Sequence, residues 1–191
     1  LMQRIPEPEL MTTQEQVDAY ADADFSGGDS RTVALVAQLL DETGSLPKDP
    51  LIVDLGCGPG NITIRLAELF PKAQVLGIDG SEPMLAVAKQ RSVHRSNNLS
   101  FIHAQLHDIA IELKDSADLV VSNSLLHHLQ DPDLLWSVTQ SIAKPGCRVL
   151  HRDLRRPTSL AEVHHLQQHH LPKAPSVLIQ DFTASLVAAY T

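Results

Sequence analysis

Residues 51–60 read LIVDLGCGPG, and this stretch decides the fold. Apart from Asp54, its first five residues are apolar, which is typical of a strand buried on both faces of a parallel sheet. Three alternating glycines follow, and residues 61–70 then carry apolar side chains at helical spacing up to Pro71. A strand, a glycine turn and a helix in this order predict a nucleotide-binding βαβ unit, because glycine lets the backbone turn sharply and approach a ligand closely.

The register of the glycines indicates which nucleotide is bound. A dinucleotide-binding turn has the pattern G-x-G-x-x-G, but Asn61 stands where the third glycine would fall, and the turn lacks the lysine of a phosphate-binding loop. Asp54 precedes the first glycine by two residues and favours a ligand with positive charge. A second strand, residues 74–78, leads into Asp79, which is placed to accept both ribose hydroxyls. The pattern predicts adenosine without phosphate and with a cationic tail.

Two motifs carry a family resemblance: DLGCGPG (residues 54–60) and GIDGSEPML (residues 77–85). They closely resemble the class I S-adenosylmethionine-dependent methyltransferases, and the similarity runs from about residue 14 to residue 155. It implies a Rossmann-like α/β fold, a doubly wound, mostly parallel sheet with helices on both faces. It also implies S-adenosyl-L-methionine as cofactor and in-line transfer of its methyl group. The cofactor-binding positions expected from the pattern and the resemblance are Tyr20, Asp54, Gly56, Gly58, Gly60, Asp79, Gly80, Met84, Gln105, Leu106 and Asn123.

Each expected contact has a chemical role. Asp54 and the glycine turn orient the methionine ammonium, and Asp79 holds the ribose. Gln105 stands where the family usually has Asp; its carbonyl still accepts from the adenine amine, and Leu106 offers a backbone amide. Tyr20 lies on a helix predicted from the Thr13 capping box to about Asp24, and its alternative role, like that of Met84, is core packing.

The rest of the chain predicts alternating helices and strands. A Gly27-Gly28 break precedes a second helix that ends at Gly44, and Pro145-Gly146 ends a helix that begins after Asp131-Pro132. Further strands are expected at 99–104, 117–122 and 147–153, with Asp108 on a loop. Parallel strands with right-handed crossovers bring their carboxyl ends to one edge, where four expected site residues then meet: Gly56, Asp79, Gln105 and Asn123.

We expect a single methyltransferase domain over residues 1–191. It divides into N-terminal helices (12–45), a cofactor-binding core (50–155) and substrate-side helices (156–191), the last of which include an amphipathic helix from Leu178 to Tyr190. The family's sheet has seven strands and ends in an antiparallel hairpin. We therefore expect this chain to lack the C-terminal antiparallel strands, with the substrate side truncated, so that something else covers the edge of the fifth strand.

The candidate catalytic residues are His127 and His128, which follow Asn123 at the end of the fourth strand. If the acceptor is an O–H or N–H group, a base must take its proton, and a histidine of near-neutral pKa suits this role. The alternative is that both histidines only pack and form hydrogen bonds beside the cofactor, because alignment of an activated donor can suffice.

Two other polar clusters receive structural interpretations. His165 and His169 are one helical turn apart but have no carboxylate or cysteine nearby in sequence, so no metal is predicted. Arg152, Arg155 and Arg156 are interpreted as a solvated, salt-bridged loop.

Composition and net charge indicate which classes of partner this chain is suited to bind. The net charge is −8 and the two cysteines are far apart, which favours neither nucleic acid nor a disulfide framework. We expect a cytoplasmic enzyme with a small-molecule substrate, no membrane association and an undetermined oligomeric state. Two alternatives remain: a non-catalytic S-adenosylmethionine-binding protein and, less favoured by the glycine register, an NAD-dependent oxidoreductase.

Overall fold

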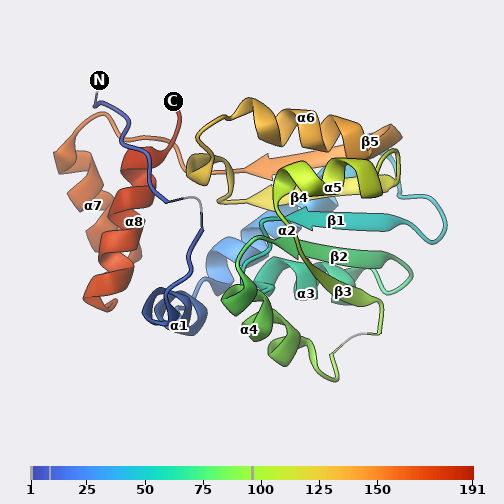
Figure 1. Cartoon of the computed structure of the whole chain (residues 1–191), viewed down its shortest axis with the longest axis horizontal. Coiled ribbons are helices and arrows are strands. Elements are labelled where there is room, and N and C mark those ends of the chain that lie inside the picture. Colours follow the sequence, from blue (N-terminus) through green and yellow to red (C-terminus); the bar gives the residue numbers. More distant parts are fainter. Residues whose placement is uncertain (1, 9, 96) are drawn as a thin grey trace.

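The computed structural model describes residues 2–8, 10–95 and 97–191. Its centre is a parallel five-stranded sheet of order β3-β2-β1-β4-β5 (Figure 1). The strands are β1 (Leu51–Leu55), β2 (Gln74–Asp79), β3 (Leu99–His103), β4 (Ala117–Asn123) and β5 (Ala143–Arg152). The helices are α1 (Gln14–Asp22), α2 (Ser26–Thr43), α3 (Asn61–Leu69), α4 (Glu82–Ser92), α5 (Leu106–Glu112), the 3-10 turn η1 (Leu126–His128), α6 (Asp133–Ile142), α7 (Leu160–His170) and α8 (Ser176–Ala188). The doubly wound α/β fold class predicted from the sequence is confirmed.

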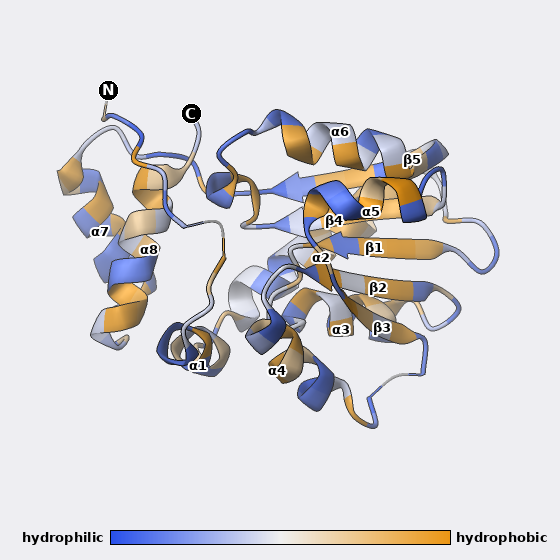
Figure 2. Ribbon diagram, in the orientation of Figure 1, coloured by the Kyte–Doolittle hydropathy of each residue, from blue (hydrophilic) through white to orange (hydrophobic). Residues whose placement is uncertain are grey.

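The sheet separates two apolar cores because successive side chains of a strand point to opposite faces. Val53 and Val120 pack with residues of α5 and α6, whereas Ile52 and Leu119 pack with residues of α2 and α3. Both faces are therefore buried, which explains why β1 and β4 are almost continuously buried and carry runs of apolar residues (Figure 2).

α4 packs against β2 and β3, and three other helices lie beyond the carboxyl ends of the strands. α1, α7 and α8 form a separate group at this edge, and the N-terminal segment runs between them and the sheet (Figure 1). α8 packs against α1 and η1. Arg4 ties the segment down, since its guanidinium donates to the carbonyls of Ala188 at 2.6 Å and Leu129 at 3.0 Å. The N-terminal segment and the C-terminal helices thereby close the far side of a pocket at the carboxyl ends of the strands.

Several local predictions were wrong at the level of single turns. Gly27-Gly28 does not break the chain but lies in the first turn of α2, where amides need no helical partner and where the Asp24 carboxylate accepts from the Ser26 amide at 3.0 Å. Pro145-Gly146 lies inside β5 beside a register irregularity, because α6 already ends at Ile142.

Two more differences concern the segments around the site. Asp108, expected on a loop, lies in the first turn of α5, which the sequence analysis did not anticipate. The last helix ends at Ala188, and Tyr190 lies beyond it with its hydroxyl donating to the Leu129 carbonyl at 2.8 Å. Within the described residues the sheet ends at β5, where Val149 is 38% exposed. No helix in this described part combines the length and apolarity needed to cross a membrane.

Candidate functional site

The glycine turn between β1 and α3 has the backbone that its sequence predicts. Gly56, Gly58 and Gly60 have φ values of 67°, 52° and 80°, a region that favours glycine. The amides of Gly56 and Cys57 both donate to the Ile78 carbonyl, at 2.8 and 3.0 Å, which joins the turn to the end of β2. A Cβ on Gly56 would lie 2.7 Å from a methyl carbon of Leu125. Glycine is therefore required in this turn, and the turn is open on the side that faces the ligand.

Asp54 lies under this turn and is 2% exposed. Its Oδ2 accepts from the Thr63 hydroxyl at 2.7 Å. The pKa of Asp54 is raised to about 7, mainly by burial and also by the nearby Asp79 carboxylate, while the hydrogen bond from Thr63 opposes the shift. A buried carboxyl with no basic partner here is suited to receive a cationic group from a ligand.

Asp79 ends β2 and organises the next loop. Its Oδ2 accepts from the Gly58 amide at 2.8 Å and its Oδ1 from the Ser81 amide at 2.7 Å. Burial raises the pKa of Asp79, and these two amides lower it. Ser81 in turn caps α4 by accepting from the Met84 amide. One carboxylate thus links the glycine turn to the start of α4.

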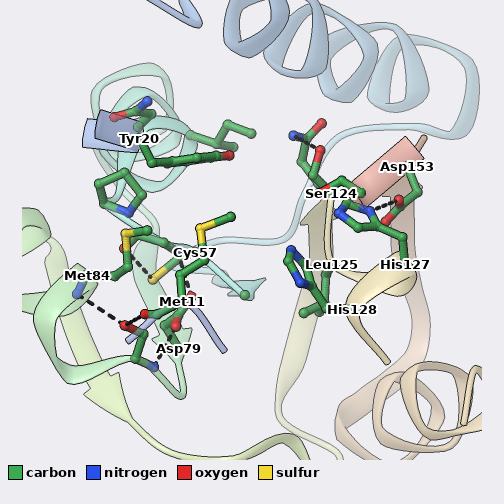
Figure 3. A pocket seen from close by; sticks show the side chains of 18 of the residues that line it. Met11, Tyr20, Cys57, Asp79, Met84, Ser124, Leu125, His127, His128 and Asp153 are labelled. Carbon is green, nitrogen blue, oxygen red and sulfur yellow. Dashed lines mark hydrogen bonds and ion pairs between the residues drawn. The ribbon is translucent and has the colours of Figure 1, made fainter. Parts of the chain in front are cut away.

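These groups line a cavity of about 640 Å³ at the carboxyl ends of the strands. All the cofactor-binding positions expected from the sequence line it except Gly60, which sits at the start of α3 against Ala88 and Phe101. His127 and His128 line it as well. Figure 3 shows two walls: one carries Met11, Tyr20, Cys57, Asp79 and Met84, and the other carries Ser124, Leu125, His127, His128 and Asp153.

Tyr20 and Met84 combine the two roles that the sequence left open. Tyr20 stacks on Phe25 with ring centroids 4.7 Å apart, and burial raises the pKa of its hydroxyl to about 12. Met84 is 4% exposed. Met84 therefore belongs to the core, Tyr20 is half-buried against Phe25, and both residues also line the cavity.

Asn123, at the end of β4, is held by side chains from two other elements. Its Oδ1 accepts from the Thr32 hydroxyl at 2.9 Å and from the Arg152 guanidinium at 3.3 Å, and Arg152 also donates to the Gly28 carbonyl at 3.1 Å. The interpretation of Arg152 as part of a solvated loop was therefore wrong. It joins α2 to the ends of β4 and β5, a contact that only the tertiary structure creates.

Two neighbouring histidines lie on the second wall, His127 buried and His128 half-buried. His127 is 2% exposed; its Nδ1 lies 2.5 Å from Asp153 Oδ1 and its Nε2 lies 3.4 Å from Glu7 Oε1. His128 stacks beside it at 4.3 Å between ring centroids, with Nδ1 3.4 Å from the Pro8 carbonyl. Burial, together with the neighbouring His127, lowers the pKa of His128 to about 4. His128 is therefore neutral near pH 7.

Sequence reasoning missed several residues at this site. Asp153 follows β5, so the rule that ligands bind at the carboxyl ends of parallel strands was a usable signal for it. Leu10 and Met11 also line the cavity, and Glu7 contacts both histidines. They belong to a segment without periodicity, and nothing in the sequence indicated its position. Asp181 on α8 lines the cavity too.

Two proteins of known name resemble part of this chain in sequence. Trans-aconitate 2-methyltransferase from Variovorax paradoxus is 44% identical over 103 residues, which are 53% of this chain and 37% of that protein. The enzyme of the same name from Yersinia pestis is 42% identical over 96 residues, 50% of this chain and 35% of the relative. The chain thus spans about a third of the length of these curated relatives.

Solved structures share the fold at lower identity. The plantazolicin methyltransferase in complex with a triazolic desmethylPZN analogue and S-adenosylhomocysteine aligns with a TM-score of 0.63 at 16% identity, covering 94% of this chain and 60% of that one. Haemonchus contortus phosphoethanolamine N-methyltransferase 2 with S-adenosyl-L-methionine aligns with a TM-score of 0.55 at 24% identity, covering 78% and 35%. A family model described as a methyltransferase domain matches residues 48–183. Because that match covers more than half of the chain and includes the glycine turn, Asp79 and both histidines, this protein belongs to the methyltransferase domain family.

Proposed function

We propose that this protein transfers a methyl group from S-adenosyl-L-methionine to a small-molecule acceptor. The observation that carries the proposal is the pair of carboxyl groups, the buried Asp54 and the half-buried Asp79, which converge on the glycine turn at one wall of the cavity. Among the described lining residues there is no lysine, and the one arginine, Arg152, is engaged by Asn123 and Gly28. This wall suits adenosine with a cationic tail better than a pyrophosphate.

Each residue of this wall is assigned to a different part of the cofactor. Asp54 receives the methionine ammonium, and the positive charge of the ligand favours the ionised form of a carboxyl whose pKa is about 7. Asp79 keeps lone pairs for the ribose hydroxyls while its two amide contacts hold the loop. Gln105 and Leu106, at the start of α5, flank the adenine position, and Met84 packs against the ring.

The second wall receives the acceptor. The sulfonium donor is already activated, so alignment of the two reactants supplies most of the catalysis, and it can lower a barrier by roughly 7–11 kcal/mol. His127 and His128 border the acceptor position. We propose them as the groups that receive a proton when the acceptor is an O–H or N–H, with His128 in its neutral form.

The acceptor itself is proposed only as a small molecule. The trans-aconitate 2-methyltransferases match half of this chain, and the cavity has little to bind a polycarboxylate. Its described lining includes Asp24, Asp29, Asp153 and Asp181 besides the cofactor carboxylates. An uncharged or cationic acceptor fits this charge better. The two cysteines are free, which supports the proposed cytoplasmic location.

The test measures cofactor binding and methyl transfer separately. We expect calorimetry to detect S-adenosylhomocysteine binding at one site per chain, no binding of NADH, and at least tenfold weaker binding in Asp79→Asn. Tritiated S-adenosylmethionine incubated with fractionated metabolites should then label an acceptor. Binding without labelling in any fraction would favour a non-catalytic binding protein, and binding of NADH in place of S-adenosylhomocysteine would overturn the proposal.

A further inference from the structure

Three ligand-type side chains meet at the second wall. Glu7 Oε1 lies 3.4 Å from His127 Nε2 and 3.4 Å from His128 Nδ1, and the three atoms lie within 4.8 Å of one another. Ligand atoms that bind one Zn²⁺ tetrahedrally at about 2.1 Å are separated by roughly 3.4 Å. The two distances to Glu7 therefore already match the edges of a metal coordination sphere.

The Glu7 carboxylate has an unmet requirement at this point. Its side chain is 8% exposed, and Oε1 is one of two buried side-chain polar atoms in the described residues that form no hydrogen bond of acceptable geometry. Its other oxygen accepts from the Ser185 hydroxyl at 3.3 Å, which orients Oε1 toward the histidines. A buried carboxylate oxygen without a partner is unfavourable, and a cation between Glu7, His127 and His128 would satisfy it.

His127 is oriented as a metal-binding histidine is. Its Nδ1 lies 2.5 Å from Asp153 Oδ1, so Nδ1–H donates to the carboxylate and the lone pair of Nε2 points toward Glu7. Asp153 is itself fixed, because it accepts from the backbone amides of Leu126 at 2.6 Å and Leu154 at 2.7 Å. A carboxylate on the second ring nitrogen sets the tautomer and raises the basicity of the ligand.

The charge around these three side chains is negative and therefore also favours a bound cation. Glu7 and Asp153 are acidic, and the second unpartnered atom in the described residues, Asp181 Oδ2, belongs to a residue whose charge also acts on Glu7. The nearest guanidinium, Arg4, donates to the His127 carbonyl and lies over the Tyr190 ring at 4.1 Å. Its guanidinium thus contacts backbone carbonyls and an aromatic ring rather than Glu7 or Asp153.

We propose that Glu7, His127 and His128 bind one divalent transition-metal ion, with Zn²⁺ as the reference ion, in the cavity wall opposite the glycine turn. Two histidines and one glutamate leave the fourth position of a tetrahedral site for water or a substrate oxygen. Because both histidines line the cavity, that position faces the acceptor. Coordination replaces the proton-accepting role proposed above for the metal-free protein: His127 binds the metal through Nε2, and His128 binds through Nδ1 with its proton on Nε2.

This proposal departs from the sequence expectation of no metal and uses different residues. The pair considered there, His165 and His169, is exposed on α7 with ring centroids 6.4 Å apart, and it belongs to no group of three candidate ligands in the described chain. The pair provides a matched control, because it offers the same kind of ligand without a buried carboxylate.

The experiment is a Zn²⁺ titration of EDTA-treated, dialysed full chain in the absence of cofactor, followed by calorimetry and by competition with a chromophoric chelator. We expect one Zn²⁺ per chain, and a Co²⁺ form with the visible absorption of a tetrahedral site. Glu7→Gln keeps the shape and removes the charge, so it should weaken binding at least tenfold. Asp153→Asn should weaken it about 10–100-fold. The double variant His165→Ala/His169→Ala should bind as the wild type does.

Each outcome decides the matter. Absence of a saturable site in the wild type, equal affinity in Glu7→Gln, or loss of the site in the α7 double variant would overturn the proposal. Wild-type stoichiometry and the Co²⁺ spectrum need no variant, so a folding defect in Glu7→Gln leaves the test intact. S-adenosylhomocysteine binding is measured apart from the metal, so a failed metal site and a failed methyltransferase assignment are distinguishable.

Discussion

Asp54→Asn should make the cofactor-free protein more stable at alkaline pH. The folded-state pKa of Asp54 is about 7 against an ordinary 3.8, so the folded chain holds this proton over a pH range in which the unfolded chain releases it. Stability from this residue is complete below pH 4 and is lost as the pH rises toward 7. Each pH unit in that window costs about 1.4 kcal/mol, so the loss between pH 5 and pH 8 is about 2–3 kcal/mol. Asparagine keeps a similar shape and carries no charge.

The assay is urea unfolding of wild type and Asp54→Asn at pH 5 and pH 8 without cofactor. The variant should gain relative to the wild type by about 2–3 kcal/mol between these values. Asp41→Asn, which removes an exposed carboxylate on α2, controls for net charge. Adding S-adenosylhomocysteine should reverse the ranking at pH 8, because its ammonium pairs with the ionised wild-type carboxylate. A stability difference that does not vary between pH 5 and pH 8 would refute the assignment of Asp54 as a buried, unpaired carboxyl.

Two further substitutions test the frame of the cavity. Gly56→Ala should lower the free energy of unfolding by about 1–2 kcal/mol, because alanine is strained at the positive φ of this position. It should also weaken S-adenosylhomocysteine binding, because the new methyl group would displace Leu125. An unchanged melting temperature and an unchanged affinity would contradict this. Arg152→Met should lower stability by about 1–3 kcal/mol, since it removes the guanidinium that donates to the Gly28 carbonyl, the Thr32 hydroxyl and the side-chain carbonyl of Asn123. A melting temperature equal to that of the wild type would restore the interpretation of Arg152 as a solvated loop residue.

The sequence by itself determined the fold class and the cofactor wall. Both depend on features that are close together in the sequence. Alternating glycines specify a turn by their backbone freedom, and β-branched runs specify buried strands. The order of strands and helices then specifies a parallel sheet. Asp54 and Asp79 follow from this order, because each lies at the carboxyl end of its strand. These features require no knowledge of distant contacts.

Only the tertiary structure decided what faces the cofactor. Glu7 and His127 are 120 residues apart in the chain, and their contact depends on where a segment without periodicity crosses the end of the sheet. Arg152 likewise found its partners through the packing of α2 against the sheet. Such contacts arise from the burial of whole elements, and burial depends on the sum of many weak apolar contacts that no short motif encodes. The acceptor wall is therefore a property of the folded chain, whereas the cofactor wall can be recognised from a few consecutive residues.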